Sequence, residues 1–177
     1  MILALAGRRI DAEGAQPPRF PLGNAEVVRG RLRALLRVEQ PAALASSAAC
    51  GADLLALLEA GTLGIRRRVV LPFERQRFRA SSVTDRPGDW GPSFDLVVDE
   101  VATRGDLVIL DGADGDEAYA AANGRVLDEA LRLAASPRDA AAVLVWEGAS
   151  RGAGDLTAAF GDGAAARGLR VIHVKTV

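Results

Sequence analysis

Short runs of apolar residues recur along the chain, and longer stretches with a helical pattern separate each run from the next. The runs are Ile2–Ala6, Ala42–Ser46, Arg68–Leu71, Leu107–Leu110, Ala141–Trp146 and Leu169–Val174. Within each run the apolar residues are mostly consecutive. Consecutive apolar residues are typical of parallel strands that helices cover on both faces, whereas alternation is typical of a sheet with one face in water. The runs therefore predict buried parallel strands.

The stretches between the runs have the spacing of amphipathic helices. We expect helices over Asn24–Val38, with Asn24 as the N-cap, and over Gly51–Leu63, Ser93–Arg104, Asp116–Ala135 and Asp155–Arg167. This alternation predicts an α/β protein, a Rossmann-like three-layer sandwich with a mainly parallel sheet of about five to seven strands. We expect one domain over residues 1–177, with the first strand inside the sheet. Two segments without a clear period, Gly7–Gly23 and Arg79–Gly91, are expected to form long irregular loops.

The composition excludes several classes of protein. The 22 basic and 23 acidic residues nearly cancel, so no overall field recruits nucleic acid or an anionic membrane. The single Cys50 and the single His173 exclude a disulfide framework and argue against a metal site of those residue types. No apolar run approaches the ~20 residues of a membrane span, and Arg8 and Arg9 follow the first run, whereas signal peptides carry their positive charges first. We expect a cytoplasmic protein with no membrane or nucleic-acid partner, no metal and no cofactor.

In an open parallel sheet the ligand lies outside the carboxyl ends of the strands, so the loops that leave the strands carry the candidate residues. After the second run, Ser47 and Gly51 belong to a loop of small residues, and Asp53 stands in the first turn of the following helix. The backbone amides at such a helix start bind anions. Arg8 follows Gly7, and a guanidinium matches a phosphate with two hydrogen bonds. The alternative is that both loops are ordinary connections, with Asp53 favouring the helix dipole and Arg8 in solvent.

Other candidate residues have two interpretations each. Tyr119 could stack on a base and Asn123 could bond a ribose or a base edge, or Tyr119 belongs to the core and Asn123 to the surface. The segment Pro72–Trp90 mixes aromatic residues with arginines, which suits a nucleobase and its phosphates as well as an ordered lid without a ligand. Cys50 lies near a helix start, which would lower a thiol pKa, but a buried structural cysteine is the commoner case. His173 lies inside a strand and is expected to be structural.

Several motifs together resemble the SLOG superfamily, the Rossmann-like group that includes the cytokinin-activating LOG proteins and the DNA-processing protein DprA. Ser46–Asp53 is similar to the family's Gly-Ala-Asp loop, and Arg68–Phe73 is similar to its next strand with a terminal proline. Tyr119–Asn123 resembles a feature of a bacterial branch whose members are often fused to effector or repeat domains. Gly152–Thr157, followed by Ala165–Leu169, is similar to the glycine-rich turn, helix and final strand that close the domain. The resemblance extends over most of the chain.

The resemblance implies a nucleotide or a nucleotide-derived ligand in the cleft. Enzymatic members of the family cleave the N-glycosidic bond of nucleoside monophosphates and carry a Pro-Gly-Gly-x-Gly-Thr loop followed by a glutamate. The corresponding segment here, Asp111–Glu117, lacks the proline, the paired glycines and the threonine, and it contains three aspartates. Carboxylates this close would repel a phosphate unless a cation intervened. Hydrolysis is therefore not expected, and Glu117 and Glu147 are only weak catalytic candidates.

We therefore expect a ligand-binding or sensor domain for a nucleotide or a nucleotide-derived molecule. One alternative is a nucleosidase or nucleoside-monophosphate phosphoribohydrolase, and another is a structural or assembly domain with a vestigial cleft. A homodimer and an effector protein encoded nearby are left open as partners. As a loop residue, Arg8 is expected to contribute little to stability. The expected ligand-binding residues are Gly7, Arg8, Ser47, Gly51, Ala52, Asp53, Phe73, Tyr119, Asn123, Gly152, Gly154 and Thr157.

Overall fold

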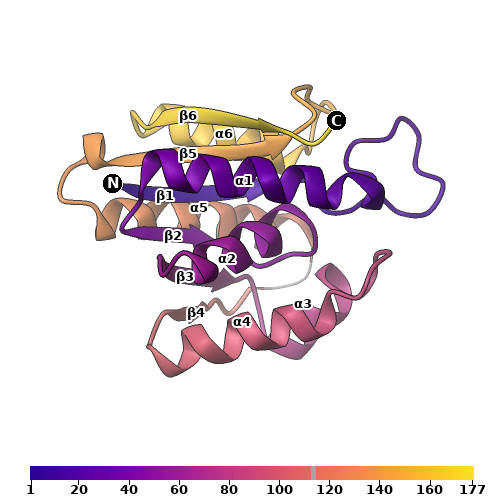
Figure 1. Ribbon diagram of the computed structural model, residues 1–177, viewed down its shortest axis with the longest axis horizontal. Coiled ribbons are helices and arrows are strands. Elements are labelled where there is room, and N and C mark those ends of the chain that lie inside the picture. The colour runs from indigo at the N-terminus through magenta and orange to yellow at the C-terminus, as the bar shows by residue number, and fades with distance from the viewer. Residues whose placement is uncertain (113–114) are drawn as a thin grey trace.

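The computed structural model describes residues 1–112 and 115–177. Within these residues the strands form one parallel sheet in the order β4-β3-β2-β1-β5-β6 (Figure 1). The strands are β1 (Ile2–Gly7), β2 (Ala43–Ser46), β3 (Arg66–Leu71), β4 (Leu107–Ile109), β5 (Ala140–Trp146) and β6 (Arg170–Lys175). The prediction of a Rossmann-like α/β fold with a parallel sheet is confirmed.

The helices cover both faces of the sheet. On one face lie α1 (Ala25–Glu39), α2 (Ala52–Thr62) and α4 (Gly91–Thr103), and on the other lie α5 (Asp116–Leu133) and α6 (Leu156–Ala166). The shorter elements are η1 (Leu22–Asn24), α3 (Arg75–Ser82) and η2 (Pro137–Asp139). The sheet is thus the middle layer of three, which is why most of its strands are apolar on both sides.

β1 lies inside the sheet, between β2 and β5, as the sequence predicts. Successive side chains of a strand point to opposite faces. Leu3 and Leu5 therefore belong to the core under α1 and α2, whereas Ala4 and Ala6 belong to the core under α5 and α6. The small side chains on the second face leave room for α5, which contacts β1, β2 and β3.

The structure differs from the sequence-based prediction mainly between β3 and α4. The segment expected to be irregular contains part of α3, a helix that the sequence pattern does not reveal. Glu74 caps its start, because the Glu74 carboxylate accepts hydrogen bonds from the backbone N–H groups of Gln76 and Arg77. Phe78 and Ser82 are the buried residues of this helix, so its apolar period is weak.

At two other element ends, the side chains make contacts that the sequence pattern does not predict. Asn24 occupies the N-cap of α1, but its side chain does not cap the helix, since its Nδ2 donates to the carbonyl oxygen of Thr176 at 2.8 Å. β3 begins at Arg66, before the predicted Arg68. A charged residue is stable at this position because the Arg66 guanidinium pairs with Asp106 at 2.7 Å.

The chain changes direction across the sheet between β1 and β5. From β1 it adds β2, β3 and β4 on one side, and then it returns to add β5 and β6 on the other. The loop after β1 leads to α1 on one face, and the loop after β5 leads to α6 on the opposite face (Figure 1). The two loops therefore diverge and leave a crevice at the carboxyl edge of the sheet, which is where ligands of such sheets bind.

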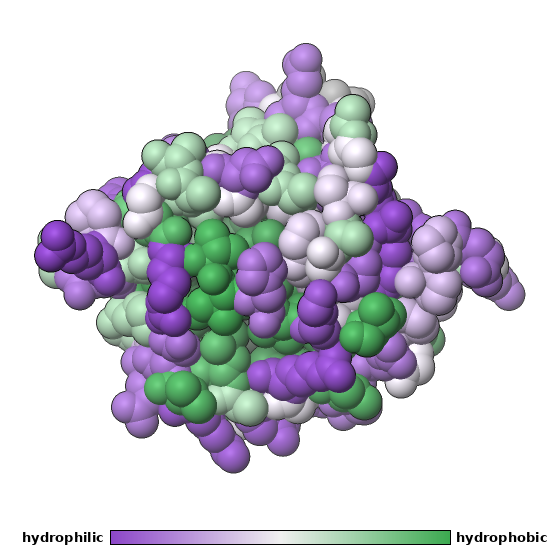
Figure 2. Space-filling model, turned by 90° about the horizontal axis from the view of Figure 1, so that it is seen from above, coloured by the Kyte–Doolittle hydropathy of each residue, from purple (hydrophilic) through white to green (hydrophobic). Residues whose placement is uncertain are grey.

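β6 forms one edge of the sheet. Figure 2 views the molecule from above Figure 1, where β6 lies, and shows apolar side chains gathered at the centre of this face with charged ones around them. Ile172 and Val174 line a shallow groove here together with Leu35 of α1. Arg170 and Lys175 stand at the two ends of the strand, where charged side chains discourage pairing with a strand of another chain.

Candidate functional site

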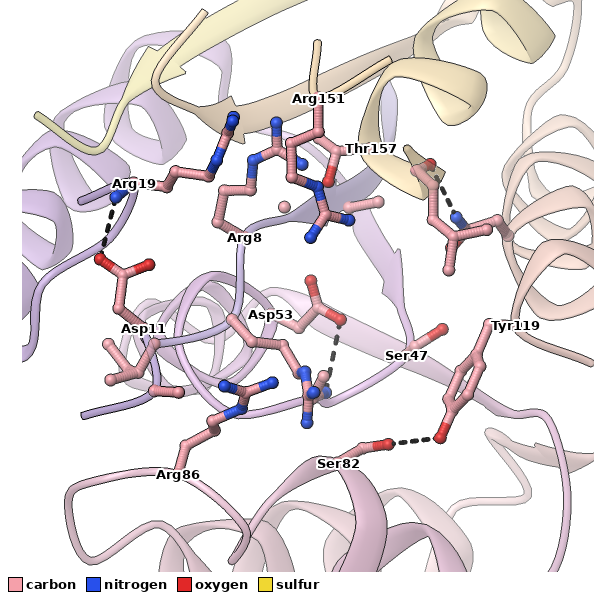
Figure 3. Close-up of a pocket in the computed structure, with 18 of the residues that line it drawn as sticks. Arg8, Asp11, Arg19, Ser47, Asp53, Ser82, Arg86, Tyr119, Arg151 and Thr157 are labelled. Atoms are coloured by element: carbon pink, nitrogen blue, oxygen red, sulfur yellow. Dashed lines mark hydrogen bonds between the residues drawn. The ribbon is translucent and has the colours of Figure 1, made fainter. Parts of the chain in front are cut away.

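A cavity of about 500 Å³ lies at the carboxyl edge of the sheet, in the crevice between the loops after β1 and β5 (Figure 3). Its walls come from the exits of β1 and β2, from α3 and the segment after it, and from the beginnings of α5 and α6. This volume is within the range of small-molecule sites. The predicted binding residues that line it are Gly7, Arg8, Ser47, Asp53, Tyr119, Asn123 and Thr157.

The other predicted binding residues lie outside the lining of this cavity, and they are Gly51, Ala52, Phe73, Gly152 and Gly154. Gly51 has a φ of +93°. A Cβ on Gly51 would lie 2.9 Å from both the carbonyl oxygen of Arg8 and the backbone nitrogen of Ile10. The glycine is therefore required by the close approach of two protein loops. Its expected role in ligand binding stays a prediction.

Ala52 and Gly7 pack against each other at the base of the crevice. A Cβ on Gly7 would lie 2.5 Å from the Cβ of Ala52 and 2.6 Å from the carbonyl oxygen of Val145. The Ala52 N–H donates to the carbonyl oxygen of Arg8 at 3.2 Å. The first amide of α2, expected to bind an anion, is thus already occupied by the exit of β1.

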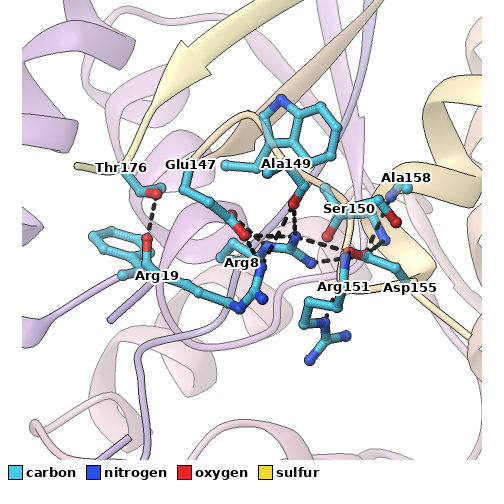
Figure 4. A network of polar contacts seen from close by, with 12 residues as sticks. Arg8, Arg19, Glu147, Ala149, Ser150, Arg151, Asp155, Ala158 and Thr176 are labelled. Carbon is cyan, nitrogen blue, oxygen red and sulfur yellow. Dashed lines mark hydrogen bonds and ion pairs between the residues drawn. The ribbon is translucent and has the colours of Figure 1, made fainter. Parts of the chain in front are cut away.

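Arg8 is the centre of a buried ionic network (Figure 4). Only 5% of the residue is exposed. Its Nε and Nη2 donate to Glu147 at 2.7 and 2.9 Å, and its Nη1 and Nη2 donate to Asp155 at 2.7 and 2.8 Å. Nη2 also donates to the carbonyl oxygen of Ala149 at 3.0 Å. All three nitrogens of the guanidinium thus donate to the protein itself. The alternative that placed Arg8 in solvent is wrong.

Asp155 joins this network to the start of α6. Its carboxylate accepts from the backbone N–H groups of Arg151 at 2.7 Å, Thr157 at 3.0 Å and Ala158 at 3.2 Å. Burial alone would raise the pKa of Asp155, but the Arg8 guanidinium and these N–H groups hold it well below its usual range. The pKa of Glu147 is lowered in the same way, against the effect of its burial. Both carboxylates are therefore ionised partners of Arg8.

Arginines outnumber acidic residues in the described lining of the cavity. Among the described residues, the arginines that line it are Arg8, Arg9, Arg19, Arg86 and Arg151, and the acidic residues are Asp11, Asp53 and Asp116. Arg151 is the most available, because 52% of its side chain is exposed and its nearest carboxylate, Asp155, is 3.7 Å away. Arg9 and Arg86 share Asp85, at 2.8 and 3.4 Å. The other four arginines pair with Glu147, Asp155 or Asp85, which lie outside the described lining, so Arg151 has the least compensated charge.

Sequence reasoning missed most of the wall that follows β1. The residues of this loop that it did not assign to the site are Arg9, Ile10, Asp11, Ala12, Ala15, Gln16, Pro17 and Arg19. The loop was recognisable as long and irregular, but long-range contacts fix its path. Asp11 accepts from the backbone N–H groups of Arg19 at 2.9 Å and Phe20 at 3.0 Å, and the Arg19 guanidinium pairs with Glu147. Glu147 is far from this loop in the sequence.

Tyr119 and Asn123 belong to the wall contributed by α5. The Tyr119 hydroxyl lies 3.0 Å from the hydroxyl of Ser82, and its ring meets Phe73 edge-on with 5.7 Å between centroids. The Asn123 Nδ2 donates to the carbonyl oxygen of Leu156 at 3.1 Å and so ties α5 to α6. Both side chains line the cavity while also holding neighbouring elements together.

Asp53 lies at the base of the cavity and is only 6% exposed. Its Oδ2 accepts from the backbone N–H of Ala49 at 3.3 Å. Its buried Oδ1 has no hydrogen-bond partner among residues 1–112 and 115–177. Burial raises the pKa of Asp53 to about 7, against the lowering effects of the Ala49 N–H, the Ser46 hydroxyl, the Gly7 N–H and Arg9.

The remaining candidates lie elsewhere. Neither Glu117 nor Glu147 belongs to the described lining of the cavity. Cys50 is fully buried, and burial raises the pKa of its thiol to about 11, which fits a structural cysteine and not a reactive one. His173 is exposed on β6, where its Nδ1 accepts from Trp146 Nε1 at 2.9 Å. Of the Asp111–Glu117 segment, Ala113 and Asp114 lie outside the described residues.

The fold and the cavity define an α/β protein with an arginine-containing crevice at the switch point of a parallel sheet. No family model matches the chain, and a search of curated proteins finds no match either. In the described ranges, no helix is long and apolar enough to span a membrane. The same ranges contain no cluster of three or more His, Cys, Asp or Glu side chains able to hold a metal ion.

Proposed function

We propose that the protein is a binding domain for an anionic, nucleotide-derived molecule, as its resemblance to the SLOG superfamily implies. One observation carries the proposal. The guanidinium-bearing residues Arg9, Arg86 and Arg151 reach one cavity from three separate loops, and an aromatic side chain, Tyr119, lines the same cavity. Guanidiniums suit phosphate oxygens, and an aromatic ring suits a base.

The roles in the proposed site differ from those that the sequence suggested. Arg8 moves from ligand binding to the frame, because Glu147 and Asp155 occupy its donors. Arg151 takes its place as the phosphate ligand, since its side chain is half exposed at the mouth of the same network. Tyr119 keeps the role of contacting the base.

The catalytic residues suggested by the sequence do not support hydrolysis, so we propose binding. A nucleosidase needs a carboxylate beside the sugar. Glu117 and Glu147 lie outside the described lining, which leaves Asp11, Asp53 and Asp116 as the carboxylates that line the cavity. Glu147 is also held by Arg8 and Arg19. A binding domain of this kind would act as a sensor, passing occupancy to an effector protein or to a second copy of itself.

Ligand-dependent melting with an arginine variant tests the proposal. AMP at a hundred times its dissociation constant should stabilise the protein by ~2.7 kcal/mol, which raises the melting temperature by about 5–10 °C for a chain of this size. Arg151→Ala should remove most of this shift and leave the melting temperature without AMP nearly unchanged, because the side chain is 52% exposed.

Arg138→Ala is the matched control. Arg138 is exposed in η2, just before β5 begins, and therefore lies at the edge of the sheet opposite the cavity. This variant should keep the full AMP-dependent shift. The proposal is wrong if AMP, NAD and related nucleotides cause no shift, or if Arg151→Ala and Arg138→Ala respond alike. Release of free base during the incubation would favour the nucleosidase alternative.

A further inference from the structure

Only one of the two carboxyl oxygens of Asp53 has a hydrogen-bond partner among the described residues. Its Oδ2 accepts from the Ala49 N–H at 3.3 Å, whereas its Oδ1 has no hydrogen-bond partner in the part of the chain that the structure describes. The residue is deeply buried, since only 6% is exposed, and Figure 3 shows its carboxyl pointing into the cavity. A buried polar atom without a partner is rare in proteins and costs free energy. The cavity is where a ligand would supply the partner.

The surroundings of Asp53 stabilise its charge poorly. The Ser46 hydroxyl lies nearby, but its one hydrogen is donated to the carbonyl oxygen of Leu5 at 3.0 Å. Arg9 is a cation that acts on Asp53, but it pairs with Asp85 at 2.8 Å. The charged or titratable groups that face the cavity are Arg9 and Asp11 after β1, Arg86 after α3, Asp116 and Tyr119 on α5, and Arg151 before α6.

Arg8 and Arg19, the other two arginines of the described lining, do not stabilise the negative charge of Asp53 either. Arg8 and Arg19 both pair with Glu147, and Arg8 pairs with Asp155 as well. Burial therefore dominates, and it raises the pKa of Asp53 to about 7. The cost of protonating this carboxyl is thus small near neutral pH.

An ionised Asp53 and an anionic ligand would repel each other within one small cavity. A neutral carboxyl has the opposite effect, because its O–H can donate to a phosphate oxygen. We infer that Asp53 meets the ligand as a neutral carboxylic acid and donates its proton in a hydrogen bond to the ligand's anionic group, so that binding takes up a proton. This inference rests on the proposed function, and it adds that the site binds more tightly in acid than in alkali.

Asp53→Asn is a matched variant for this inference. The amide that D53N introduces would have the shape of the protonated acid, with an oxygen for the Ala49 N–H and an NH₂ group for the ligand, but it does not titrate. The dissociation constant of AMP is measured for both proteins from pH 6 to pH 9. AMP's own ionisation affects both proteins equally and cancels in the ratio. The ratio of the wild-type to the D53N dissociation constant should stay flat below pH 7 and rise about tenfold per pH unit above it.

A calorimetric measurement on the wild-type protein alone provides a second test that does not depend on how the variant folds. The heat of AMP binding at pH 8 is compared in two buffers with different ionisation enthalpies. The difference should correspond to uptake of about 0.9 proton per AMP, which is the ionised fraction of a group with a pKa of about 7 at that pH.

Four results would overturn the inference. A flat ratio between pH 7 and pH 9, or no proton uptake, would mean that Asp53 does not change its charge on binding. A ratio that falls with rising pH would mean that an ionised Asp53 accepts a hydrogen bond from a ligand hydroxyl or amino group. Failure of AMP, NAD and related nucleotides to bind to either protein at any pH would overturn the proposed function, and the inference with it.

Discussion

All three nitrogens of the Arg8 guanidinium donate to acceptors of the protein itself, so this residue belongs to the frame of the crevice. Removing one partner of a buried ion pair leaves an uncompensated charge, which costs about 3–5 kcal/mol. Arg8→Ala should therefore lower the unfolding free energy by about this amount in a urea titration. Arg8→Lys should restore only part of it, since an ammonium cannot make the two-pronged contacts with both Glu147 and Asp155.

Arg37→Ala is the control for Arg8. Arg37 is exposed in the last turn of α1, so its replacement should change the unfolding free energy by no more than about 0.5 kcal/mol. If Arg8→Ala also stays within that range, the network around Glu147 and Asp155 does not stabilise the fold. The sequence could not reveal this network, because the partners of Arg8 are 139 and 147 positions away.

Asp53 makes the stability of the protein depend on pH in the direction opposite to an ion-paired carboxylate. Its pKa is about 7 when folded, against 3.8 as its ordinary value, so between pH 4 and pH 7 the folded state holds a proton that the unfolded state has lost. The unfolding free energy therefore falls as pH rises, by ~1.4 kcal/mol per unit and by ~4 kcal/mol in all, and the loss is complete above pH 7.

Urea titrations of the wild-type protein and D53N from pH 4 to pH 8.5 test this dependence. The amide does not titrate, so D53N should gain stability relative to the wild type as pH rises, with most of the change between pH 4 and pH 7. The comparison between the two proteins removes the contribution of Asp155 and Glu129, whose pKa values are lowered and whose loss of stability comes in acid. A constant difference between the two proteins would contradict the burial argument.

At the scale of the elements, the end of β1 can pack closely against the start of α2 because Gly7 has no side chain. Gly7→Ala would place a Cβ 2.5 Å from the Cβ of Ala52 and 2.7 Å from the Cβ of Val145, so either α2 or β5 must move. Overpacking of this kind costs about 1–3 kcal/mol or more. We expect Gly7→Ala to lower the melting temperature by several degrees, on the order of 5 °C.

Gly30 provides the matched control for Gly7. It lies in α1, and nothing approaches within 4 Å of the position that a Cβ would take. Gly30→Ala should therefore raise the unfolding free energy by ~0.5–1 kcal/mol, because alanine loses less backbone entropy on folding. Equal effects of the two substitutions on the melting temperature would show that the Gly7 contact is not close in solution.

The sequence predicted elements well where burial sets the pattern and poorly where side-chain hydrogen bonds set it. The strand at Ile2–Gly7 was recognisable because both of its faces are covered, which makes its apolar run continuous. The helix α3 was not recognisable, because it is short and only Phe78 and Ser82 of it are buried. Its cap, Glu74, is also not one of the usual N-cap residues. The Gly-Ala-Asp loop was recognised as special, but Gly51 and Ala52 serve the packing of α2 on β1.

At the scale of the whole molecule, the topology rule for parallel sheets located the crevice, while the sequence did not show which loop residues face it. The loop after β1 has no period, and its path depends on contacts with the far end of the chain. Thr176, after β6, donates to the carbonyl oxygen of Arg19, and Glu147, after β5, pairs with the Arg19 guanidinium. A ligand in the cavity would therefore contact both the loop after β1 and the turn after β5, which are distant in the sequence.

Amide hydrogen exchange tests whether one ligand joins these segments. AMP at a hundred times its dissociation constant should slow exchange by up to about a hundredfold at amides whose local opening releases the ligand. We expect this protection both in the loop Gly7–Gly23, which supplies many lining residues, and in the turn Gly148–Gly154, which supplies Arg151. η2 at the opposite edge of the sheet should exchange at an unchanged rate. Protection confined to one of the two segments would mean that the ligand binds to one wall alone, and uniform protection of the whole chain would mean that AMP acts only through global stability.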